Sequence, residues 1–128
     1  MARQVKSGTG WRLGWNPDAP EFQGLAAGDS WAVELTAPEF DDLCRLALQL
    51  ADSVTAIASE LMPEERLTCE AESKWIWLEA DGYPDRYSLR FIVQTGRRCE
   101  GARPCEAVPE LLPAIVVVKN YGEIAIRR

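Results

Sequence analysis

The side chains that could do chemistry gather in the C-terminal third of the chain, where five arginines are close in sequence. They are Arg86, Arg90, Arg97, Arg98 and Arg103. The rings of Tyr87 and Phe91 lie among them. Guanidinium groups bind phosphates and aromatic rings stack on unpaired bases, so this combination on one sheet indicates a single-stranded nucleic-acid binder. The alternative places both rings on the core face and leaves the arginines solvated or paired with acidic side chains.

The charge of the chain disfavours a nucleic-acid partner. Residues 1–85 hold 6 basic and 16 acidic side chains, residues 86–128 hold 8 and 4, and the net charge is −6. An acidic surface weakens phosphate binding at physiological salt. We therefore expect a binding or protein-interaction module with an unknown protein partner, and single-stranded nucleic-acid binding is the alternative.

The chain contains no histidine, which removes most catalytic and metal-binding motifs. Ser–His–Asp and Cys–His nucleophiles, zincin motifs and Cys₂His₂ fingers all need an imidazole. The stretch Gly8–Leu13 begins like a dinucleotide-binding fingerprint but has Leu13 where the third glycine belongs, and we expect no strand before it. We expect a protein that is not an enzyme and holds no cofactor or metal. An enzyme built on carboxylates with shifted pKa values is the remaining alternative.

The four cysteines are Cys44, Cys69, Cys99 and Cys105. They lack the two close pairs of a zinc ribbon, and we expect free thiols. The alternatives are a Cys99–Cys105 disulfide and a metal or redox role. The polar start Met1–Lys6 does not resemble a secretory signal, and no apolar run approaches the ~18–20 residues of a membrane-spanning helix. A cytoplasmic protein without membrane contact is the expectation.

The clearest predicted element is a long helix at about 37–62. Thr36 and Glu39 form a capping-box pattern around Pro38, and apolar residues then recur at three- and four-residue steps until Pro63. A second, short helix is expected at about 107–118, although Pro113 and the run Val116–Val118 leave a strand there as the alternative.

Strand-like alternation predicts the rest of the fold. It covers residues 11–15, 30–35, 67–72 and 87–93. A short apolar run at 75–78 predicts a further strand, which a hairpin loop at 81–85 joins to the last one. Strands that follow each other after short turns pair antiparallel. The sequence of 128 residues therefore predicts a single α+β domain, residues 1–128, in which a curved antiparallel sheet packs against one long helix.

The strand at 75–78 is apolar on both faces. Trp75 and Trp77 share one face, and Ile76 and Leu78 share the other. One of these faces must therefore be covered within the chain or by a partner, and we expect Ile76 and Leu78 at a protein interface. A symmetric homodimer is the commonest way to cover such a patch.

Four stretches carry a resemblance to a known family. They are Gly10–Trp15, Pro38-Glu39-Phe40, Gly96–Gly101 and Val108–Leu112. The chain resembles a family of small uncharacterised cyanobacterial proteins with plastid relatives, over almost its whole length. The resemblance implies a cystatin-like architecture, similar to the single-stranded-DNA-binding transcriptional regulator fold of the Whirly proteins. It implies no site residues, and the lysine- and glycine-rich loop of Whirly DNA binders is absent here.

Overall fold

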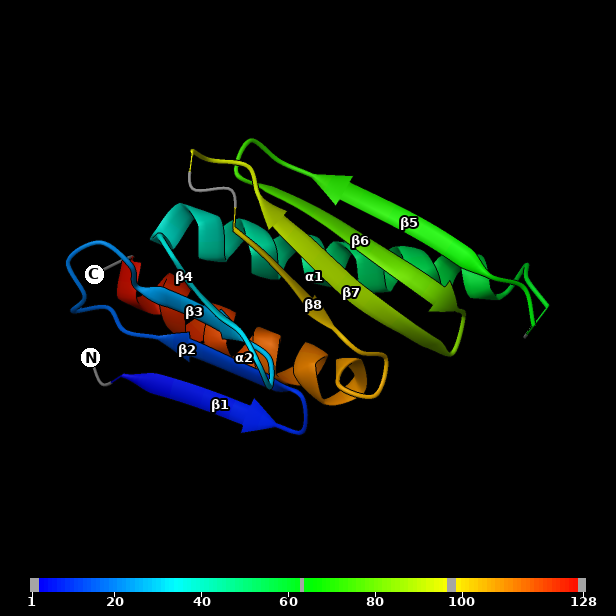
Figure 1. The fold of residues 1–128 in the computed structure, drawn as a ribbon, viewed down its shortest axis with the longest axis horizontal. Coiled ribbons are helices and arrows are strands. Elements are labelled where there is room, and N and C mark those ends of the chain that lie inside the picture. The colour runs from blue at the N-terminus through cyan, green and yellow to red at the C-terminus, as the bar shows by residue number, and fades with distance from the viewer. Residues whose placement is uncertain (1–2, 63, 97–98, 127–128) are drawn as a thin grey trace.

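The computed structural model describes residues 3–62, 64–96 and 99–126 as eight strands and two helices. Their order along the chain is β1 (Gln4–Gly8), β2 (Trp11–Trp15), β3 (Gly24–Ala27), β4 (Ala32–Leu35), α1 (Ala37–Ala58), β5 (Leu67–Glu72), β6 (Ile76–Tyr83), β7 (Arg86–Val93), β8 (Glu100–Arg103) and α2 (Val108–Ile126). Both helices lie on one side of the strands (Figure 1). Among the described residues, no helix is long and apolar enough to cross a membrane.

The predicted α+β class is confirmed, and the strands form two antiparallel sheets. Strands β1 to β4 pair in sequence order in one sheet, and β5 to β8 pair in sequence order in the other. The expectation that no strand precedes Gly8–Leu13 is wrong, because β1 pairs antiparallel with β2 there. The curved sheet expected from the sequence is thus divided at the edge strands β4 and β8, which contact each other without forming a ladder in the described part of the chain. The chain enters α1 directly after β4, so the next strand starts a new sheet instead of extending the first (Figure 1).

The N-terminus of α1 is capped as the sequence predicts. The Thr36 side chain accepts a hydrogen bond from the Glu39 amide, and the Thr36 amide donates to Glu39 Oε1 at 2.9 Å. This reciprocal pair satisfies two backbone donors that a helix start leaves free. The helix ends at Ala58, four residues before the predicted position, because Glu60 and Leu61 donate to carbonyls three residues back and tighten the chain into turns.

The C-terminal helix α2 extends to Ile126 and is longer than the predicted 107–118. A helix, and not the alternative strand, covers the valine run: Ile115 and Val118 are buried, whereas Val116 and Val117 are exposed. This three-residue spacing of buried positions is helical. Pro113 lies inside the helix, where it removes one backbone hydrogen bond without ending the element.

The core fills the space between the sheets and the two helices. The β1–β4 sheet contributes Trp11, Leu13 and Trp15 from β2, and Trp15 stacks on Phe40 of α1 with ring centroids 5.5 Å apart. The β5–β8 sheet contributes the inner side chains of β6 and β7. A single core therefore joins the two sheets, and it leaves the opposite face of each sheet outward.

Candidate functional site

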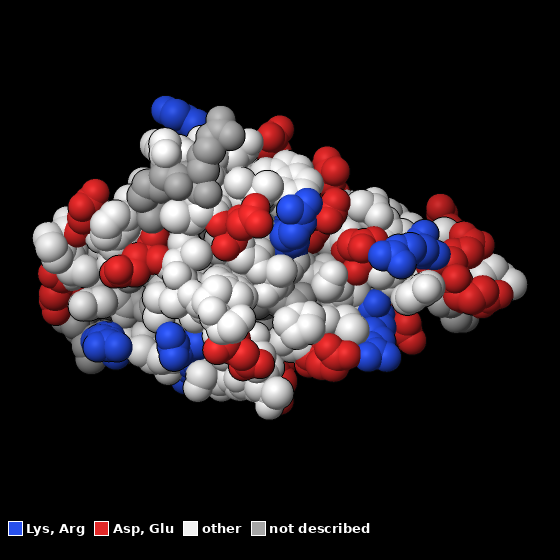
Figure 2. All heavy atoms as spheres, viewed as in Figure 1, with Lys and Arg blue, Asp and Glu red and all other residues white. Residues whose placement is uncertain are grey.

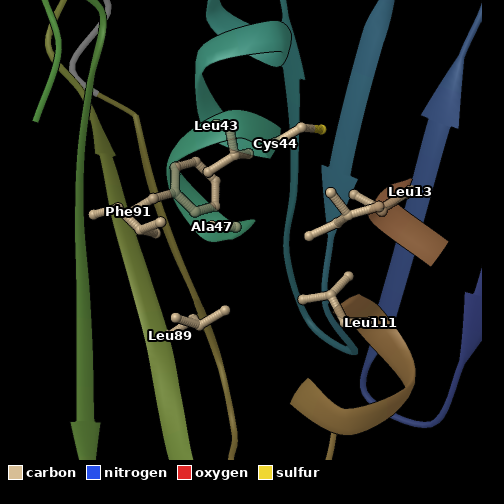
Figure 3. Close-up of a pocket in the computed structure, with 9 residues that line it drawn as sticks. Leu13, Leu43, Cys44, Ala47, Leu89, Phe91 and Leu111 are labelled. Atoms are coloured by element: carbon tan, nitrogen blue, oxygen red, sulfur yellow. The ribbon is translucent and has the colours of Figure 1, made fainter. Parts of the chain in front are cut away.

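The interior holds a small cavity where both sheets meet both helices (Figure 3). Its lining is apolar and comprises Leu13, Leu43, Cys44, Ala47, Leu78, Leu89, Phe91, Leu111 and Ile115. The cavity volume is about 20 Å³, close to the space of one water molecule. A space this small and without polar groups is a gap in core packing that offers no binding group to a ligand.

The buried acidic side chain of the core, Glu39, is held by its neighbours. It is 2% exposed, and its Oε1 accepts the Thr36 amide while its Oε2 accepts a hydrogen bond from Thr95 Oγ1 at 3.2 Å. The carboxylate thus caps α1 and connects it to the segment after β7. Its position and partners indicate a structural function.

The four cysteines are free thiols, as expected from the sequence. Cys44 is buried, and Cys69, Cys99 and Cys105 are half-buried. Within the described ranges, no three acidic or sulfur side chains gather closely enough to hold a metal ion.

The structure separates the predicted nucleic-acid arginines from the rings. Arg86 pairs with Glu106 and also donates to Cys105 Sγ at 3.1 Å. Phe91 is buried in the core, and Tyr87 packs half-buried against it, where burial raises the pKa of its hydroxyl. Arg97 and Arg98 lie outside the described residues, and Arg103 ends β8. Where the structure describes them, the rings face inward and Arg86 has an acidic partner.

A surface hollow of about 280 Å³ lies at the β6–β7 hairpin, between Arg66 and Arg86. Arg66 donates two hydrogen bonds to the Asp81 carboxylate, at 2.7 and 3.2 Å. These bonds, with a third from Thr68, hold the pKa of Asp81 below its usual value. Both guanidinium groups of the hollow are therefore already neutralised by carboxylates of the same chain.

The expectation that Ile76 and Leu78 form an interface is wrong. These side chains are 0% and 1% exposed and belong to the core, whereas Trp77 is half-buried on the outer side of β6. Glu79 and Asp81 follow Trp77 at two-residue steps, so they share its face. This charged continuation was the signal in the sequence that Trp77 faces outward.

Trp77 and Ile92 form the centre of the outer face of the β5–β8 sheet. They are directly paired across β6 and β7, and Glu72 of β5 and Glu100 of β8 complete the same row. Trp77 and Ile92 lie outside the core cluster and are half-buried. The helices cover the opposite side of this sheet (Figure 1), so the row lies on an open surface.

The next row places charges beside this apolar centre. Glu70, Glu79 and Arg90 are paired in register across β5, β6 and β7. The Arg90 guanidinium lies over the Trp77 ring, 4.8 Å from its centroid, and its Nε is 3.7 Å from Glu79 Oε1. We call the two rows, with the Thr68, Asp81 and Ser88 row that follows, the Trp77 face. Figure 2 shows acidic side chains outnumbering basic ones on this side of the molecule.

Comparisons with known proteins find similarity over most of the chain. The model of a domain of unknown function, DUF1818, matches residues 6–118. A crystal structure of a protein with unknown function from Prochlorococcus sp. NATL2A, described as belonging to the DUF155 family, is similar with a TM-score of 0.85 and 26% identity. The similarity covers 91% of this chain and 98% of that one. No curated protein matches the sequence.

Proposed function

The chain belongs to the DUF1818 family of unknown function, and from this premise we propose that it is a non-enzymatic interaction module that binds another protein through the Trp77 face. One observation carries the proposal: a half-buried tryptophan and its paired isoleucine occupy the middle of an open sheet face. Aromatic anchors surrounded by polar residues are typical of protein interfaces. The cytoplasm is the compartment that fits its free thiols.

The surroundings of Glu39 and the interior cavity support the non-enzymatic part of this proposal. Glu39 caps a helix with both carboxylate oxygens occupied, and the interior cavity is apolar. An enzyme needs titratable groups that converge on a site able to admit substrate. The described residues therefore favour protein binding at a surface over catalysis in a pocket.

Binding of single-stranded nucleic acid is the alternative, and its support is the architecture that the Whirly resemblance implies. It would use the arginine group of the C-terminal third. Arg86 and Arg90 each have a carboxylate partner, and the open face around Trp77 is acidic. Phosphates are repelled by such a face, so the charge favours a protein partner.

Site-specific photo-crosslinking tests the proposal. A benzophenone amino acid replaces Trp77 in one variant and Thr55, exposed on α1, in a control. We expect a crosslinked protein species in the native host from position 77 that the position 55 control does not give. Equal crosslinking from both positions, or products removed by nuclease, would contradict protein binding at this face. A product of twice the chain mass would identify a second copy of this chain as the partner.

A further inference from the structure

We infer that the partner bound by the Trp77 face presents a basic segment, with lysine or arginine side chains on both sides of an apolar residue. The inference rests on the proposed function, because it assigns the chemistry of the partner at the same face. Three features carry it: the charge of the face, its apolar centre and a hollow at its edge.

The Trp77 face has an excess of negative charge. Its carboxylates are Glu70, Glu72, Glu79, Asp81 and Glu100. Two of them are neutralised within the chain, Glu79 by Arg90 and Asp81 by Arg66. Among the described residues, Glu70, Glu72 and Glu100 have no ionic partner. These three side chains surround the apolar centre and offer charges that a basic partner would complement.

The apolar centre and its flanking charges lie in one row. Glu72, Trp77, Ile92 and Glu100 follow each other across four adjacent strands. Neighbouring strands lie about 4.8 Å apart, so the backbones at Glu72 and Glu100 are separated by about 14 Å. An apolar side chain on Trp77 and Ile92 would place basic residues on either side within reach of Glu72 and Glu100, since lysine and arginine extend their charge on long stems.

A hollow at the β8 side of the row has room for one such stem. It measures about 390 Å³ and is lined by Ile92, Val93, Gln94 and Glu100. The stem of a lysine or arginine would pack against Ile92, and its charged group would reach the Glu100 carboxylate. The hollow therefore offers an apolar surface for the stem of a basic side chain and a carboxylate for its charged group.

The same charges disfavour the other occupants. A second copy docked face to face would bring Glu72 and Glu100 against identical carboxylates, and the whole chain carries a net charge of −6. Like charges across an interface suppress association. Nucleic-acid phosphates meet the same repulsion. A basic protein segment is the occupant that the face attracts.

A peptide titration tests the inference. The probe is a fluorescein-labelled peptide with the core Lys-Arg-Ile-Lys-Arg, and an otherwise identical peptide with glutamate at the four basic positions is the control. Fluorescence anisotropy is measured at 50 and 500 mM NaCl. We expect saturable binding of the basic peptide, at least tenfold weaker at the higher salt, because screening shortens the range of exposed charges. Equal binding of both peptides would overturn the inference, as would a lack of saturable binding by the basic one.

Matched variants separate this face from general attraction to an acidic protein. Glu100→Lys should weaken binding at least fivefold, and Glu72→Lys provides a second reversal at the other end of the row. Asp52→Lys makes the same charge change at an exposed position of α1, on the opposite side of the sheet, and should leave the affinity within twofold. Circular dichroism verifies the fold of each variant. Equal losses in Asp52→Lys and Glu100→Lys would overturn the inference.

The two proposals fail in different ways. If the position 77 crosslink identifies a protein whose contacting segment is neutral or acidic, the basic-partner inference is wrong and the interaction face stands. If position 77 gives no specific protein crosslink, the proposed function itself is wrong.

Discussion

The indole ring of Trp31 lies directly over Gly101, and this contact joins the two sheets. A Cβ atom at position 101 would lie 2.5 Å from two ring atoms of Trp31 and 2.8 Å from Phe91. Trp31 also contacts Phe91 of β7 with ring centroids 5.8 Å apart. Trp31 precedes β4 and Gly101 belongs to β8, so the tryptophan fills the junction where these two edge strands meet, and in the described part of the chain they do not pair in one sheet.

Gly101→Ala should therefore destabilise the protein by ~1–3 kcal/mol, the usual cost of overpacking a core. Gly96→Ala is the matched control, because a Cβ there would meet no atom within 4 Å. Urea unfolding followed by tryptophan fluorescence compares the two. Equal stability of the two variants would show that Trp31 can move away from Gly101 at little cost.

Neighbouring side chains on β6 should respond very differently to truncation. Leu78→Ala removes a core side chain that is 1% exposed and should cost ~2–5 kcal/mol. Trp77→Ala removes a half-buried side chain outside the core, and we expect it to cost less than Leu78→Ala. The midpoint of urea unfolding measures both. A larger loss of stability in Trp77→Ala than in Leu78→Ala would mean that the outer face of β6 contributes to the core.

The capping box of α1 provides a third prediction. Thr36→Ala removes the side-chain oxygen that accepts the Glu39 amide and should cost ~1 kcal/mol. Thr55→Ala changes an exposed threonine inside the same helix and should stay within ~0.5 kcal/mol. Thermal unfolding distinguishes them, and similar losses would mean that the cap contributes no more than an exposed helix position.

The Arg66–Asp81 pair should give a pH-dependent contribution to stability. The pKa of Asp81 is lower when folded, chiefly because Arg66 donates hydrogen bonds to it. The stabilisation is thus present above the unfolded aspartate pKa of about 3.9 and is lost as the pH falls through the lower folded value. NMR titration of the side-chain carboxyl carbon should show the pKa rising in Arg66→Gln. An unchanged pKa in that variant would assign the shift to another group.

Thiol reactivity should follow burial. Cys44 is 1% exposed and lines the interior cavity, whereas Cys69, Cys99 and Cys105 are half-buried. Ellman's reagent should modify the half-buried thiols first and Cys44 only on unfolding, with Cys44→Ala identifying the slow phase. Denatured protein without reductant should show four reactive thiols; two would indicate the Cys99–Cys105 disulfide.

Local patterns were sufficient to predict the class of the fold and the start of α1. The capping box uses residues three positions apart, and the strands follow alternation within a few residues, so their signals lie in short stretches of chain. The β6–β7 hairpin was predicted for the same reason. The full length of α2 was not, because Pro113 and the valine run weaken the local preference for helix.

The sequence by itself determined that the chain packs an apolar core against one long amphipathic helix and that its charge is acidic overall. The charged Glu79 and Asp81 on the Trp77 side of β6 already indicated which face enters that core. Only the tertiary structure decided that Trp77 is paired with Ile92 and stays half-buried on the outer face. The division into two sheets and the pairing of Arg86 with Glu106 were also tertiary outcomes. These contacts join residues far apart in the chain, and their free energy depends on packing that short-range patterns do not encode.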